Sequence, residues 1–171
     1  MLWLVRNGGA IPMRRESPVL LICPAWPKAE DAGTQSILFD AMKRHCRQVR
    51  DHPIGLNPGK DEIERAVDQA KRDRTLVIGT INAHLNRGQG DLARGCIEVN
   101  PSAVVVSMAN PYDLKSIPTQ NAIATYHPQG CISDLVRATE ALGHYTQRTR
   151  LARQIGLLFA SSRYYRPPTQ D

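Results

Sequence analysis

The stretch VVVSMANPYDLKSIP (Val104–Pro118) contains the clearest fold signal of the chain. It begins as a continuously apolar run and ends in a polar loop that carries Asn110, Tyr112 and Asp113. A short apolar run of this kind is typical of a strand buried on both faces, as in a parallel sheet. Pro111 fixes its own φ and keeps the preceding residue out of the helical region, so the loop is expected to be rigid.

Strand-like and helix-like segments alternate on either side of this stretch. The predicted strands are Val19–Cys23, Arg47–Gly55 (weaker and near an edge), Thr75–Asn82, Ala103–Ala109, Asn121–His127 and Leu157–Ser161. The predicted helices are TQSILFDAMKRHC with Thr34 as N-cap, GKDEIERAVDQAKRDR, GQGDLARGCIEVN and CISDLVRATEALG. This alternation predicts an α/β fold, a three-layer αβα sandwich with a mainly parallel, flavodoxin-like sheet of about five or six strands.

The length of 171 residues and the apolar content of 42% suit one domain with a real core. We expect a lead-in at residues 1–16, an α/β core at 17–145 and a basic, proline-containing tail at 146–171. The sequence shows no signal peptide and no apolar run of membrane-spanning length, which predicts a cytoplasmic protein without a membrane segment.

The chain carries a net charge of +6, which raises the question of nucleic-acid binding. Aromatic residues make up only 5%, and no stretch interleaves them with Lys or Arg, so a solvated basic surface is the better interpretation. The four cysteines show no CxxC spacing and no paired histidines, which argues against a metal site and favours reduced core thiols. No motif predicts a cofactor.

Polar loops follow three of the predicted strands, at Pro24–Thr34, Asn82–Gly90 and Asn110–Pro118. In a parallel sheet such loops meet at the carboxyl edge, where ligands bind. The second loop offers His84 as a possible general acid or base, but a polar loop lining the sheet edge is the favoured interpretation. Its GQG turn could hold a phosphate, but the full GxGxxG pattern is absent, and a flexible turn with Asp91 as helix N-cap is favoured.

The segment VVVSMANPYDLKSIPTQNAIATY (Val104–Tyr126) resembles the C-terminal domain of glycoside hydrolase family 3, in its β-N-acetylhexosaminidase branch. Members have an apolar strand, then Asn-Pro-Tyr/Phe-Asp-Leu, a spacer with Pro, and a strand close to IATY. LWLVRNGGAIPM, TLVIGTINAHLNRGQGDLA and DLVRATEALG resemble other family segments in the same order. The closing GLLFASSRYY departs most, because Leu158 stands where the family usually has Pro.

The resemblance implies that this chain carries no catalytic residue. Family members place the nucleophilic Asp on a (β/α)8 barrel, and the hexosaminidase branch also places its Asp–His acid/base there. In the glucosidase branch the acid/base Glu comes from the C-terminal domain, but no glutamate here lies in a matching motif. The implied role is an auxiliary domain of a β-N-acetylhexosaminidase-like hydrolase, inactive alone.

That role implies a partner and a surface. The partner would be a catalytic barrel in cis or trans, with self-association through the exposed docking face as the alternative, and carbohydrate is a possible ligand. The residues expected at the substrate rim or domain interface are Asn82, His84, Asn110, Tyr112 and Asp113. A stand-alone flavodoxin-like module that binds a sugar or a nucleotide is the competing hypothesis.

Overall fold

The computed structural model of the chain describes residues 2–11, 13, 16–26, 35–36, 38–72, 75–109 and 111–125. The strands are β1 (Leu2–Asn7), β2 (Val19–Trp26), β3 (Gln35–Ser36), β4 (Val49–Ile54), β5 (Thr75–Thr80), β6 (Val104–Ser107) and β7 (Asn121–Thr125). The helices are α1 (Phe39–His45), α2 (Lys60–Ala70), α3 (Arg87–Val99) and α4 (Asp113–Ser116). The predicted helix in CISDLVRATEALG, the strand Leu157–Ser161 and the tail 146–171 lie outside the described residues.

The main sheet has the order β4-β2-β5-β6-β7-β1. The strands from β4 to β7 are parallel, whereas β1 pairs antiparallel with β7. β3 adds a short antiparallel pairing at the end of β2. The five parallel strands therefore follow the flavodoxin order, in which the chain reverses its direction of travel between β2 and β5. The predicted α/β fold with a mainly parallel sheet is confirmed.

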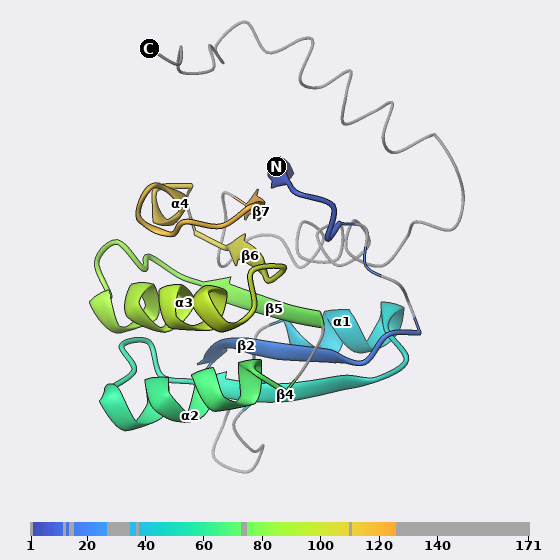
Figure 1. Cartoon of the computed structure of the whole chain (residues 1–171), viewed down its shortest axis with the longest axis horizontal. Helices are drawn as coiled ribbons and strands as arrows, with labels where there is room; N and C mark the ends of the chain where they lie inside the picture. Colours follow the sequence, from blue (N-terminus) through green and yellow to red (C-terminus); the bar gives the residue numbers. More distant parts are fainter. Residues whose placement is uncertain are drawn as a thin grey trace, which may run out of the picture.

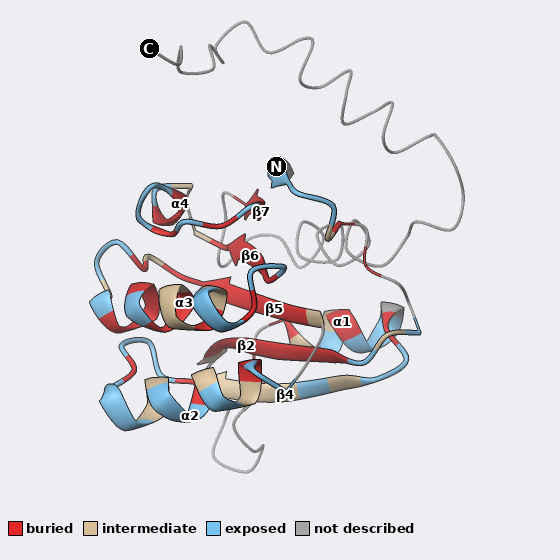
Figure 2. Ribbon diagram, viewed as in Figure 1, coloured by how far each residue is buried: buried red, intermediate tan, exposed pale blue. Residues whose placement is uncertain are grey.

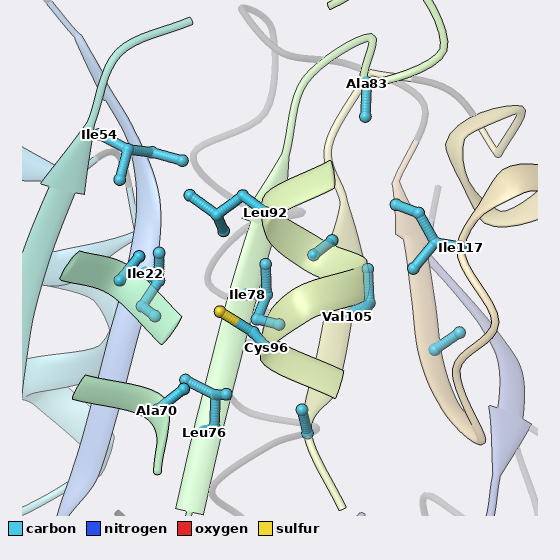
Figure 3. Close-up of a cluster of buried hydrophobic side chains, with 14 of the residues drawn as sticks. Ile22, Ile54, Ala70, Leu76, Ile78, Ala83, Leu92, Cys96, Val105 and Ile117 are labelled. Carbon is cyan, nitrogen blue, oxygen red and sulfur yellow. The ribbon is translucent and has the colours of Figure 1, made fainter. Parts of the chain in front are cut away.

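Helices cover both faces of this sheet (Figure 1). Leu38 and Met42 of α1 pack on one face with Leu21 of β2. Leu92 and Cys96 of α3 pack on the other face, beside Ile78 of β5 (Figure 3). Because side chains alternate across a strand, a strand between two helical layers is apolar at every position. This is why VLLIC reads as an uninterrupted apolar run.

Burial also distinguishes central from edge strands (Figure 2). β5 and β6 are buried almost throughout, whereas most of β4 is only partly buried. The weaker pattern of Arg47–Gly55 therefore predicted an edge position correctly at this end of the parallel sheet. At the opposite end, the N-terminal lead-in supplies β1 as an antiparallel edge strand.

The first helix begins later than its apolar spacing predicted. Residues Gln35–Ser36 pair as a strand with the end of β2, and α1 begins at Phe39 with Leu38 in the N-cap position. The predicted N-cap Thr34 lies outside the described residues. The spacing still identified the buried face, because Leu38, Met42 and Cys46 are all in the core. Strand pairing overrode the helical periodicity in the first turn.

α2 agrees closely with its prediction. Asp61 and Glu62 lie in its first turn, where carboxylates complement the helix dipole. Ala66 and Ala70 are buried, and Ile63 packs beside them in the same core. Within the described part of the chain, no helix has the length and apolar character needed to cross a membrane.

Three of the four cysteines, Cys23, Cys46 and Cys96, are buried. Burial raises the pKa of the Cys96 thiol to about 12, because the low-dielectric core disfavours the thiolate. We therefore expect Cys96 to react with a disulfide reagent at pH 8 only after unfolding, since the thiolate is the nucleophile. Thiol counting in native buffer and in urea, compared with a Cys96→Ala variant, measures this. Stoichiometric labelling of Cys96 in the native chain would contradict it.

Candidate functional site

Two hydroxyl side chains mark the carboxyl ends of neighbouring parallel strands. Thr80 ends β5 and Ser107 ends β6, and the two residues are direct register partners. Both are buried. Buried hydroxyl groups need hydrogen-bond partners, and both of these find theirs in one carboxylate that lies above the strand ends.

That carboxylate belongs to Asp113, the first residue of α4, whose residue surface is 0% exposed. Its Oδ2 accepts hydrogen bonds from Thr80 Oγ1 at 2.9 Å and from Ser107 Oγ at 3.5 Å. Its Oδ1 accepts the backbone N–H of His84 at 3.1 Å and lies 2.8 Å from His84 Nδ1. A buried charge is costly unless it is hydrogen-bonded, so these four contacts are what allow Asp113 to be buried.

His84 lies in the β5–α3 loop, and 30% of its side chain is exposed. Because Nδ1 faces a carboxylate oxygen, which can only accept, Nδ1 carries a hydrogen and donates it. Nε2 is then the ring nitrogen available to an outside group, and among the described residues no hydrogen bond to it is found. The structure thus supplies the partner carboxylate that the local sequence around His84 did not reveal.

Tyr112 lies beside this pair. It is 56% exposed, and its ring meets the His84 ring edge-to-face with centroids 6.0 Å apart. Lys115 of α4 places its ammonium group 5.0 Å from the centroid of the Tyr112 ring. His84, Tyr112 and Asp113 therefore form one cluster that we call the His84 site. His84 precedes α3 in the chain, whereas Tyr112 and Asp113 follow it.

Asn82 and Asn110 are the other two predicted site residues. Asn82 adopts a left-handed backbone conformation, with φ of 52°, and its carbonyl oxygen accepts the N–H groups of Leu85 and Asn86. Asn is one of the few residues that adopt this conformation readily, so Asn82 shapes the loop that presents His84. Asn110 lies outside the described residues.

Thr80 and Ser107 were missed by sequence reasoning. Each is a hydroxyl residue that ends a mainly apolar strand, in TLVIGT and VVVS. That shared position was the available signal, because parallel neighbours end at the same edge of a sheet. The contact with Asp113 could not be inferred, since it depends on where α4 returns over the sheet.

The GQG segment is not a flexible turn, and Asp91 is not an N-cap. α3 begins at Arg87 with Asn86 as N-cap, so the glycines lie in the first helical turn. The N–H of Gly88 donates to Asn57 Oδ1, and that of Gln89 donates to the Asn86 carbonyl. Two amides of this turn are thus already engaged within the protein. The segment packs against the neighbouring loop and forms no phosphate cradle.

Gln89 ties neighbouring loops together. Its Oε1 accepts the Ile81 N–H at 2.8 Å, and its Nε2 donates to the carbonyl oxygens of Leu56 and Ile81. The β4–α2 loop is thereby joined to the β5–α3 loop, and the pair formed by His84 and Asp113 joins the latter to the β6–α4 loop. The carboxyl edge of the sheet is a continuous hydrogen-bonded surface.

Exposed apolar side chains gather on the same edge. Leu56 is 52% exposed and Leu85 72% exposed, and each follows the carboxyl end of a parallel strand, as Tyr112 does. Only two other large apolar residues of the described chain, Val5 and Val99, are exposed. Within the described residues, no group of three or more His, Cys, Asp or Glu side chains could hold a metal ion.

No family model and no curated protein matches the chain. Among solved structures, it is similar to a glycoside hydrolase family 3 β-N-acetylglucosaminidase from Paenibacillus sp., with a TM-score of 0.70 and 21% identity over 83% of this chain and 28% of that one. A β-glucosidase from Listeria innocua gives a TM-score of 0.63 at 12% identity, over 83% of this chain and 24% of that one.

A third similar structure is a fungal multi-domain β-N-acetylglucosaminidase of the same family, with a TM-score of 0.63 and 15% identity over 83% of this chain. This chain spans only 16% of that one. These likenesses show that the chain has a fold found within structures of glycoside hydrolase family 3. The family resemblance of the sequence is thus confirmed at the level of the fold, and the chain spans about a quarter or less of each of these three structures.

Replacing Thr80 with Val should destabilise the fold by about 1.5–3 kcal/mol, because it removes a hydrogen bond to a buried carboxylate at nearly constant volume. Urea denaturation measures the free energy of unfolding. Thr75→Val at the start of the same strand is the matched control, expected within about 0.5 kcal/mol of the unaltered chain. Equal effects of the two changes would contradict the role of Thr80.

Replacing Gly88 with Ala should destabilise the fold by about 1–3 kcal/mol, because the new Cβ would overlap the carbonyl oxygen of Pro58. Gly90→Ala, in the same helical turn, is the control. Its Cβ would lie 3.5 Å from its nearest neighbour, a guanidinium nitrogen of Arg94, which is an ordinary contact. The midpoints of urea unfolding compare the two variants, and equal stability would contradict the close packing at Gly88.

Proposed function

We propose that the chain is an auxiliary domain of a β-N-acetylhexosaminidase-like glycoside hydrolase, which docks on a catalytic barrel through the carboxyl edge of its sheet. The observation that carries the proposal is the exposure of Leu56, Leu85 and Tyr112, which follow the carboxyl ends of β4, β5 and β6 at that edge. The fold likeness to enzymes of which the chain spans only a fraction supports it.

Exposed apolar surface is unfavourable in water, and this is the physical reason for expecting a docking partner at this edge. Large apolar side chains that cluster on one face of a soluble domain are typical of an interaction surface. Here the loops that carry them are held by Gln89 and by Asp113, so the surface is formed before a partner arrives. A preformed surface loses little conformational entropy on binding.

The proposal assigns no catalytic group to this chain. A retaining glycosidase needs two carboxyl groups about 5 Å apart across the scissile bond. The carboxylate of the His84 site is Asp113, and its oxygens are taken up by internal donors. The catalytic pair would therefore come from the partner.

The nucleotide-binding alternative is less well supported. Its sequence evidence was the GQG segment, whose Gly88 and Gln89 amides are bonded internally. A stand-alone sugar-binding module would use the same His84 site as the proposed auxiliary domain. The turnover and docking assays distinguish these two functions.

The first experiment is an assay of the purified, folded chain with an aryl N-acetyl-β-glucosaminide. We expect no turnover above a buffer control, because the proposal places the catalytic pair on the barrel. Turnover that is abolished by Asp113→Asn or His84→Asn would place the chemistry in this chain and would overturn the proposal.

Docking is tested with the purified barrel of a family 3 β-N-acetylglucosaminidase. We expect the double variant Leu56→Ser, Leu85→Ser to weaken complex formation, measured by calorimetry, at least about tenfold, since two apolar contacts would be lost. Val99→Ser, at the end of α3 and hence at the opposite edge of the sheet, is the control for lost apolar surface. An equally strong complex with both variants would refute docking at the carboxyl edge.

A further inference from the structure

We propose that His84, held by Asp113, is a preoriented hydrogen-bond acceptor for a hydroxyl group of a carbohydrate, with the Tyr112 ring beside it to contact the sugar. The accepting role of His84 rests on the geometry of the pair. The carbohydrate class of the ligand rests on the proposed function.

The position of the ring proton follows from the donors around Asp113. The backbone N–H of His84 can only donate, and it shares Oδ1 with the ring nitrogen Nδ1. The hydroxyl groups of Thr80 and Ser107 face Oδ2. Oδ1 already accepts the backbone N–H, so in the neutral ring Nδ1 holds the hydrogen and donates it to the same oxygen. The lone pair is then on Nε2, on the side away from Asp113.

The arrangement holds the imidazole in place. Asp113 is fixed by the ends of two buried strands, and it contacts both the backbone and the ring of His84. A ring anchored through both groups has few alternative orientations. An acceptor that is oriented before binding avoids the entropy cost of ordering a side chain.

The surroundings of Nε2 favour a ligand with both polar and apolar character. Tyr112 offers an exposed aromatic ring edge-to-face with His84, and Leu85 is an exposed aliphatic neighbour in sequence. A sugar combines hydroxyl donors with apolar C–H surfaces, so one hydroxyl can reach Nε2 while a C–H group contacts Tyr112.

The geometry is tested by ¹H–¹⁵N NMR of the histidine rings in the full chain, with His84 assigned through the His84→Asn variant. We expect the neutral His84 ring to carry its proton on Nδ1. In Asp113→Asn the amide oxygen should take the place of Oδ1, because the His84 backbone N–H can only donate there, so the Nδ1–H tautomer should persist while the charge that holds the ring is lost. A His84 ring that carries its proton on Nε2 in the unaltered chain would overturn the proposal.

Ligand binding is tested by titrating the same chain with N-acetyl-D-glucosamine. His84→Asn is the key variant, because its amide can still donate to Asp113 but has no atom in the place of Nε2. We expect binding to weaken at least about tenfold in this variant and in Asp113→Asn, with unchanged folding by circular dichroism. Tyr112→Ala changes only an exposed residue and should also weaken binding.

N-methylacetamide, which carries the acetamido group without the hydroxyls, is the control ligand and should not perturb the His84 resonances. Absence of sugar binding, or equal affinity in the His84→Asn variant, overturns this inference even if the barrel complex forms. Sugar binding that depends on His84 in a chain that forms no barrel complex would support the inference and overturn the proposed docking alone.

Discussion

The buried carboxylate of Asp113 is the constraint around which the carboxyl edge of the sheet is arranged. A charge with no exposed surface is tolerated only where donors surround it. The donors come from Thr80, Ser107 and His84, and therefore from two strands and a loop. Satisfying one charge thus fixes the position of α4 over the sheet and the orientation of an imidazole at the surface.

Gln89 connects two neighbouring loops along the same edge. Its side chain bonds the carbonyl of Leu56 in the next loop, and Gly88 packs closely against Pro58 there. These contacts give a polar site and an exposed apolar surface one rigid support. This explains how the loops can present Leu85 and Tyr112 to solvent without losing their shape, and how the proposed docking and the proposed ligand binding can share one edge.

The parallel core supplies the frame for this edge. Alternate residues of β2 and β5 pack against α1 on one face and against α2 and α3 on the other. The apolar runs of β5 and β6 end at the hydroxyl residues Thr80 and Ser107. In a sheet of the flavodoxin order these ends lie together, so chemistry concentrates there without any local sequence motif.

The sequence by itself determined the layered α/β class, the buried strands, the apolar faces of α1 and α2, and the loops in which His84, Tyr112 and Asp113 lie. These follow from hydrophobic periodicity, which is a local property. The start of α1 and the packing of Gly88 were decided by tertiary contacts, since strand pairing and a neighbouring carbonyl act across the chain. The pairing of His84 with Asp113 is also tertiary, because residues 29 positions apart meet only when parallel strands bring their loops to one edge.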